Sequence, residues 1–244
     1  MSDRTTFVLI HGGGHGGWCY AKVKHRLEAA GHEVFAPSLT GLAERAASLS
    51  PTIDLDTHVD DVVRLLHSWD LHDVVLVGHS YGGMVITGAG DRAADRVGKL
   101  VYLDAANPKD GQSLVDVAGP VITSVRPMGE TVDGVELVLL PAPGAAAFYG
   151  VTDPHDLAWM DDRLTGHPWA CFEQKLVLTD PARFASIPQF HIVCESTIPT
   201  RDKALMATAR EAERLWSIDT GHDLMVTEPD FVTRALLEVA AAPV

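Results

Sequence analysis

A serine between glycines lies in the sequence Gly78-His79-Ser80-Tyr81-Gly82, directly after the apolar residues 74–77. The G-x-S-x-G spacing is typical of a sharp turn from a strand into a helix, which lifts a serine hydroxyl clear of the backbone as a nucleophile. Glycines suit this turn because it is strained and neighbouring backbone segments pass too close for a Cβ. Helix-compatible residues follow at 84–86, so Ser80 is the first candidate catalytic residue.

A serine hydroxyl becomes a good nucleophile only with a base within hydrogen-bond reach and a carboxylate that orients the base. Among the twelve histidines, His222 is the strongest candidate, because it follows the last expected strand in a loop just before the final helix. We expect His79, behind the serine, to be a packed and hydrogen-bonded residue. His11 and His15 are expected to shape the loop after the first strand or to line a pocket.

The sequence leaves two main candidates for the orienting carboxylate. Asp104 follows the apolar run 100–103, and a carboxylate at the end of a buried strand is costly unless it is paired, which favours a functional role. Glu195 is the alternative acid, in the loop after the strand at 190–193. Asp219 is a weaker third choice.

Acyl transfer also needs backbone N–H groups directed at the developing oxyanion. We expect one from Tyr81, the residue after the nucleophile, and the second from Gly13 in the glycine loop 11–15. That loop lacks the lysine and serine or threonine of a phosphate-binding loop, and the three cysteines have no zinc spacing. We therefore expect no metal and no cofactor. Candidate substrate-binding residues are Gly12, His15, Met128, Phe148 and Trp159.

Short apolar runs at 7–10, 34–37, 74–77 and 100–103 alternate with helical patterns, and this rhythm returns after residue 188 with strands at 190–193 and 215–218. Because each run is apolar throughout, the pattern predicts a mostly parallel, doubly wound α/β sheet of about six strands, covered on both faces. One helix is expected to begin at a cap formed by Asp56 or Thr57.

The alternation breaks between residues 107 and 187, where prolines recur and no strand–helix rhythm is visible. We interpret residues 1–106 and 188–244 as the core and residues 107–187 as a lid inserted within one structural domain. Such insertions lie over the carboxyl ends of the strands, where ligands bind in open α/β sheets.

The chain has 244 residues and a formal net charge of −14, which argues against a nucleic-acid partner and favours a neutral small-molecule substrate. No apolar run has the length of a membrane span, and the N-terminus lacks the apolar segment of a signal peptide. Three cysteines do not form a disulfide framework. We therefore expect a cytoplasmic protein without a membrane partner, and a homodimer is compatible with the sequence.

These motifs together resemble the α/β-hydrolase superfamily, and more narrowly the plant methyl esterase and hydroxynitrile lyase group with its bacterial esterase relatives. The matching segments run from one end of the chain to the other; they are residues 7–12, 15–18, 27–32, 77–84, 221–223 and 228–229. The resemblance implies that Ser80 and His222 are nucleophile and base, in the chain order nucleophile, acid, base, and that Gly13 and Tyr81 supply the oxyanion N–H groups.

Two departures from this group bear on the function. The plant enzymes carry an aspartate in the loop that here holds Glu195, whereas some other α/β-hydrolases place the acid at the position of Asp104. Hydroxynitrile lyases have a threonine where Gly12 stands and a lysine where Asp223 stands. A hydroxynitrile lyase needs the charge of this lysine to hold the departing cyanide, so the hypothesis of lyase activity is disfavoured.

The sequence therefore predicts a serine hydrolase that cleaves carboxylic esters or lactones of small hydrophobic substrates through an acyl-enzyme. Alternatives are a small-molecule receptor built on the same fold, or hydroxynitrile lyase, cofactor-free C–C bond or peroxide chemistry by the same triad.

Overall fold

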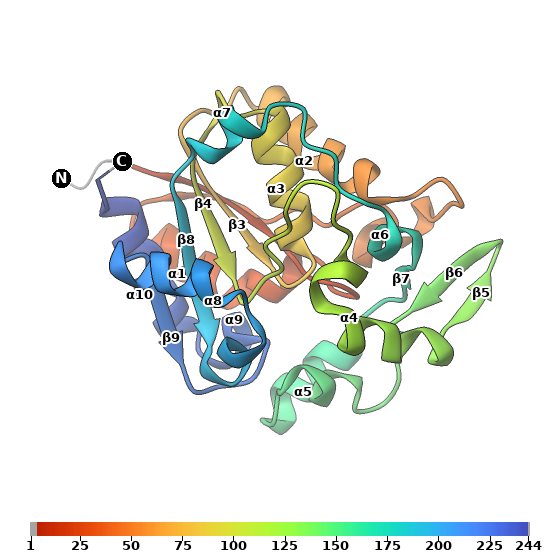
Figure 1. The fold of residues 1–244 in the computed structure, drawn as a ribbon. Coiled ribbons are helices and arrows are strands. Elements are labelled where there is room, and N and C mark those ends of the chain that lie inside the picture. The colour runs from red at the N-terminus through yellow and green to blue at the C-terminus, as the bar shows by residue number, and fades with distance from the viewer. Residues whose placement is uncertain (1–3, 244) are drawn as a thin grey trace.

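A six-stranded parallel sheet forms the centre of the protein in the computed structural model, which describes residues 4–243 (Figure 1). The strand order is β2-β1-β3-β4-β8-β9, and each neighbouring pair is parallel. The bounds are β1 Thr6–Ile10, β2 Glu33–Phe35, β3 Val74–His79, β4 Val97–Leu103, β8 Gln189–Cys194 and β9 Leu215–Ile218. The predicted fold class is confirmed.

Alternate residues of the buried strands supply two separate hydrophobic cores, one on each face of the sheet, because successive side chains of a strand point to opposite faces. Leu76 and Leu100 pack on the face covered by α2 and α3, while Val77 and Val101 pack on the face covered by α1 and α10. The helices of the core are α1 Ala21–Ala29, α2 Leu55–Ser68, α3 Gly82–Arg92, α8 Lys203–Glu211, α9 Leu224–Thr227 and α10 Pro229–Ala241. Two 3-10 helices lie among them, η1 Gly17–Tyr20 and η2 Ala43–Ser48.

Residues 107–187 connect β4 to β8 and carry a small antiparallel sheet in the order β5-β6-β7. Figure 1 shows α4, α5 and this sheet beyond the carboxyl end of the central sheet, whereas α7 lies back beside α3. The bounds are α4 Leu114–Val125, η3 Arg126–Met128, β5 Glu130–Val132, β6 Val135–Val138, η4 Ala145–Tyr149, α5 Pro154–Asp161, β7 His167–Pro168, α6 Ala170–Glu173 and α7 Pro181–Ala185. After β8, η5 spans Glu195–Thr200.

Strand register places the candidate residues at one edge of the sheet. His79 of β3 pairs with Leu103 of β4, so Ser80 and Asp104 follow neighbouring strands at the same level. The glycine loop follows β1, and His222 follows β9, at this same carboxyl edge. Within residues 4–243 no helix combines the length and the apolarity that crossing a bilayer would require.

Candidate active site

Ser80 occupies the strained turn between β3 and α3, with a φ of 54° that non-glycine residues rarely adopt. The flanking glycines are needed for close approach of the backbone. A Cβ on Gly78 would lie 2.5 Å from the carbonyl oxygen of Gly82, and a Cβ on Gly82 would lie 2.7 Å from that of Ile10. The sequence therefore folds locally as its G-x-S-x-G spacing predicts.

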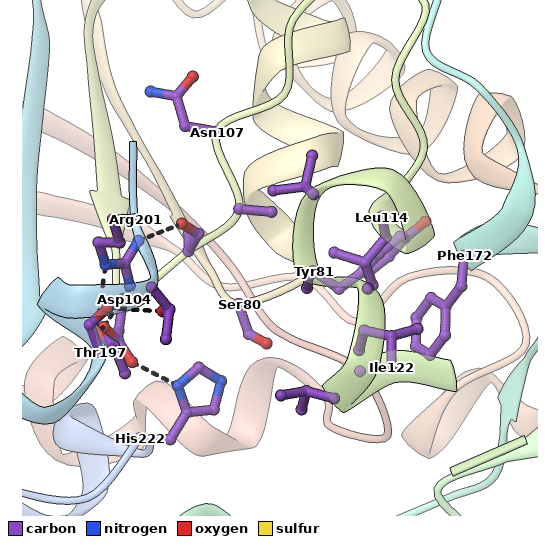
Figure 2. Close-up of a pocket in the computed structure, with 18 of the residues that line it drawn as sticks. Ser80, Tyr81, Asp104, Asn107, Leu114, Ile122, Phe172, Thr197, Arg201 and His222 are labelled. Carbon is purple, nitrogen blue, oxygen red and sulfur yellow. Dashed lines mark hydrogen bonds and ion pairs between the residues drawn. The ribbon is translucent and has the colours of Figure 1, made fainter. Parts of the chain in front are cut away.

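His222 comes from the loop between β9 and α9, and its ring faces Asp104 (Figure 2). The distance from His222 Nδ1 to Asp104 Oδ2 is 2.6 Å, and the carboxylate is fully buried. Ser80 and His222 line the same cavity. Because a carboxylate accepts a hydrogen bond, Nδ1 carries the proton, which leaves Nε2 unprotonated and able to act as a base.

The other oxygen of Asp104 is held by three donors. It accepts hydrogen bonds from the Cys194 N–H at 3.1 Å, from the Thr197 hydroxyl at 2.6 Å and from the Arg201 guanidinium. Burial acts to raise the pKa of Asp104, but the bond to His222 and the cation of Arg201 outweigh it and hold that pKa well below its usual range. The carboxylate is therefore ionised at neutral pH.

The loop after β8 thus supplies donors to the acid and does not supply the acid itself. Glu195, the alternative carboxylate, has an exposed side chain on η5, and within residues 4–243 it makes no hydrogen bond to His222. Sequence reasoning missed Thr197 and Arg201, which lie 93 and 97 residues from Asp104 along the chain and carry no local signal.

The two expected oxyanion donors, the N–H groups of Gly13 and Tyr81, belong to residues that line the cavity beside Ser80. Within the described chain neither N–H has an intramolecular acceptor. His11 fixes the peptide that carries the Gly13 N–H, since its Nδ1 lies 2.9 Å from the Gly12 carbonyl oxygen and its Nε2 accepts from the Leu39 N–H at 3.0 Å. Burial lowers the pKa of His11 to about 3, so this imidazole is neutral.

The Tyr81 side chain is held by a buried polar cluster of His58, His167 and Cys171. Its hydroxyl lies 2.9 Å from His58 Nδ1, and His58 Nε2 lies 2.9 Å from the Thr40 carbonyl oxygen. His58, His167 and Cys171 lie close enough together to resemble a set of metal ligands. Both nitrogens of His58 are already used in these hydrogen bonds, so we assign this cluster to holding the Tyr81 ring.

A cavity of about 850 Å³ opens over Ser80 and extends beneath α4. Figure 2 shows Leu114, Ile122 and Phe172 gathered on one side of Ser80, and Asn107 and Arg201 on the other. The apolar side is formed largely by α4. Its lining includes Leu114, Val117, Ile122, Val125, Leu139, Phe148 and Phe172.

Of the five expected substrate-binding residues, only Phe148 lines this cavity, and four assignments need correction. Met128 is 68% exposed on η3. Trp159 packs edge-on against Trp18 at 5.1 Å. Gly12 is buried, and a Cβ there would meet the Cβ of Ser80 at 2.8 Å. His15 is also buried, and its ring faces Asp223.

The comparison with known families bears out this fold. Residues 7–235 match the model of the alpha/beta hydrolase family. This chain belongs to that family. Among its relatives, a carbendazim-hydrolysing esterase from Nocardioides sp. (strain SG-4G) is 36% identical over 239 residues, which cover 94% of this chain and 97% of the relative. Salicylic acid-binding protein 2 from Nicotiana tabacum is 28% identical, covering 98% of each chain.

Solved structures of other alpha/beta hydrolases superpose over nearly the whole of this one. An extracellular alpha/beta-hydrolase from a Paenibacillus species has a TM-score of 0.78 at 23% identity, covering 96% of this chain and 98% of that one. At this level of identity the likeness concerns the fold. In this alpha/beta hydrolase, then, the expected resemblance is confirmed along the chain, and the candidate site lies at the carboxyl edge of the sheet, where ligands bind in open α/β sheets.

Proposed function

We propose that this alpha/beta hydrolase cleaves carboxylic esters or lactones of small hydrophobic substrates, with Ser80 as nucleophile, His222 as base and Asp104 as acid. The observation that carries the proposal is the 2.6 Å contact between His222 Nδ1 and Asp104, in the cavity that Ser80 lines. It holds the imidazole at the cavity that Ser80 also lines, and Ser80 is held on a strained turn between strand and helix.

In the proposed reaction, Ser80 Oγ attacks the ester carbonyl carbon while His222 Nε2 takes the hydroxyl proton. The carbonyl oxygen becomes an oxyanion, and the N–H groups of Gly13 and Tyr81 stabilise it. When the intermediate collapses, the bond from carbon to the alkoxy oxygen breaks and His222 passes its proton to the leaving alcohol. Water then repeats the attack on the acyl-enzyme with His222 as base, which releases the acid and regenerates Ser80.

The cavity supports a hydrophobic substrate. Apolar residues of α4, together with Leu139 and Phe172, form a continuous part of its lining, while Lys109 and Arg201 also line the cavity. We propose residues 107–187 as the lid that shapes this space, since α4 and Leu139 both belong to that segment. Relatives named for carbendazim hydrolysis and as methylesterases agree with ester cleavage.

The experiment is a chain-length series of nitrophenyl esters, assayed with intact protein and with Ser80→Ala, Asp104→Asn and Glu195→Gln. We expect the first two substitutions to lower turnover by on the order of 10³-fold or more, because each removes a member of a unit that acts together. Glu195→Gln is the matched control and should leave turnover within about twofold, because its side chain is exposed. A large loss in Glu195→Gln with activity retained in Asp104→Asn would transfer the acid role to Glu195.

A further inference from the structure

A second histidine–aspartate pair, His15 and Asp223, lies outside the lining of the cavity, and the proposed reaction does not use it. His15 Nε2 lies 2.8 Å from Asp223 Oδ2, and both side chains are fully buried. The two residues are 208 positions apart in the sequence. A fully buried carboxylate is costly unless it is paired, so this contact calls for a structural or functional reason.

The ring of His15 is enclosed by acceptors on both sides. Its Nδ1 lies 2.7 Å from the Gly13 carbonyl oxygen, which can only accept a hydrogen bond, so Nδ1 carries a proton. Its Nε2 faces the Asp223 carboxylate, and donation to an ionised carboxylate requires a proton there too. Burial lowers the pKa of His15, but the charge of Asp223 outweighs it and raises that pKa, while His15 holds the pKa of Asp223 low. The geometry therefore fits an imidazolium next to a carboxylate.

Each member of the pair is joined to a part of the site. His15 holds the carbonyl of Gly13, the residue whose N–H is proposed to bind the oxyanion. Asp223 directly follows His222, and its N–H donates to the Tyr149 carbonyl oxygen at 3.1 Å. His79 lies beside the pair, with Nε2 at 3.0 Å from the His222 carbonyl oxygen and 3.6 Å from Asp223 Oδ1.

With these contacts, both peptide groups next to the Gly13 Cα are fixed by histidines. His11 donates to the Gly12 carbonyl and His15 to the Gly13 carbonyl, so the direction of the N–H between them is set from both sides. Through Asp223 the same network reaches the loop that carries the catalytic imidazole. Positions of oxyanion donors matter at the level of fractions of an ångström, because their benefit comes from preorganised geometry.

We propose that His15 and Asp223 form a buried imidazolium–carboxylate pair that positions the oxyanion N–H of Gly13 relative to the His222 imidazole. The two are positioning residues, since neither lines the cavity. This inference rests on the proposed function, because the step that it assists is oxyanion formation. Loss of the pair should lower kcat and leave KM nearly unchanged, because a misplaced oxyanion donor weakens binding of the transition state more than binding of the ester.

The test compares Asp223→Asn with Asp219→Asn, which removes the same charge from an exposed position in the same loop. Asp219, the third carboxylate considered for the acid, makes no hydrogen bond to His222 within residues 4–243, since Asp104 occupies that place. We expect kcat for nitrophenyl butyrate to fall by on the order of 10- to 100-fold in Asp223→Asn, with KM within about twofold, and no change in Asp219→Asn. Rates are expressed per active site by titration with a fluorophosphonate. Equal kcat per titrated site in Asp223→Asn and the intact protein would overturn the positioning role and leave only a structural one.

A measurement on the intact protein keeps the proposal testable if Asp223→Asn does not fold. In ¹⁵N-histidine NMR spectra at pH 7.5, His15, assigned from a His15→Gln spectrum or by sequential correlation, should show two protonated ring nitrogens. A single protonated nitrogen would overturn the ion pair. This readout requires no turnover, so failure of the intact protein to cleave any ester would reject the proposed function without deciding the state of His15.

Discussion

The proposed nucleophile and the proposed acid are two of the eight non-glycine residues with positive φ in residues 4–243. Ser80 and Asp104 both adopt left-handed backbone conformations, with φ values of 54° and 43°, at the ends of the adjacent strands β3 and β4. Such conformations cost free energy for residues with a Cβ and persist only where the surrounding structure enforces them. Here the parallel register and the close glycines enforce them, which directs both side chains to the same edge.

Arg201 is the residue-level feature with the clearest kinetic consequence. Its guanidinium competes with the protonated ring of His222 for the charge of Asp104, since it lies against the opposite carboxylate oxygen. In Arg201→Met the imidazolium loses this competitor and becomes more stable. We therefore predict that the acid limb of the pH profile of kcat/KM moves to higher pH, on the order of 0.5–1 unit.

The control for this prediction is Arg210→Met, which removes an exposed guanidinium from α8. Its profile should coincide with that of the intact protein. An acid limb that moves to lower pH in Arg201→Met, or does not move, would contradict the role given to Arg201.

Residues with local signatures could be predicted from the sequence, whereas their long-range partners could not. The turn at Ser80 and the loop at His222 are marked by their immediate neighbours, and Asp104 by its place after a buried strand. Arg201, Thr197 and Asp223 gain their contacts only when strands distant in sequence are brought together. The four incorrect predictions of substrate-binding residues have the same cause, because the tertiary structure decides which side chains reach a cavity.

Among the secondary-structure elements, α4 contributes most to the cavity wall. Ile122 lies on it beside the apolar part of the space (Figure 2). We predict that Ile122→Trp shortens the accepted acyl chain: hydrolysis of nitrophenyl octanoate should fall by about tenfold or more relative to nitrophenyl acetate, because the larger ring fills the apolar space. The readout is the ratio of kcat/KM for the two esters.

Met128→Trp is the matched control, since Met128 is exposed and does not line the cavity. Its ratio should equal that of the intact protein. A changed ratio in Met128→Trp together with an unchanged one in Ile122→Trp would place the acyl group elsewhere.

The boundaries of elements show where sequence patterns are ambiguous. The helix expected to start at Asp56 or Thr57 is capped by Asp54, whose carboxylate accepts from the Thr57 N–H at 2.9 Å in a capping box. The hairpin of β5 and β6 turns at Asp133-Gly134, both with positive φ, a dipeptide that is a strong hairpin signal between alternating residues. The Asp-Gly dipeptide was visible in the sequence of residues 107–187, but no strands were predicted there because the alternation of strands and helices breaks in that segment.

For the molecule as a whole, several buried histidines have lowered pKa values and are neutral. Burial lowers the pKa of His11 and His79 to about 3 and that of His58 and His191 to about 4. The unfolded chain binds protons at these histidines from about pH 6.5 downward, whereas the folded one does not, so stability falls as pH falls. At pH 5 each of these four histidines lowers the free energy of unfolding by on the order of 2 kcal/mol by this linkage.

We therefore predict that the protein unfolds on acidification, as followed by circular dichroism, because protonation of these histidines favours the unfolded chain. His191→Phe, which keeps an aromatic ring against Tyr102, should move the midpoint to lower pH. His25→Phe on the exposed side of α1 should not move it. Equal free energies of unfolding at pH 4.5 and 7.5 would contradict this account of the buried histidines.

The parallel α/β sheet, the family and the carboxyl edge as the place of the site follow from patterns that span the whole chain, so the sequence was sufficient to predict them, whereas the strand order came from the structure. A cytoplasmic location, a homodimer and the lid role of residues 107–187 stay predictions.

The most direct measurement of the central claim is acid quench of the protein within milliseconds of mixing with a nitrophenyl ester, followed by peptide mass spectrometry. The account predicts an acyl group on the peptide that contains Ser80, formed in a burst, and lost when Ser80→Ala replaces the intact protein. Steady hydrolysis by Ser80→Ala at the rate of the intact protein, or an acyl group on another residue, would contradict it.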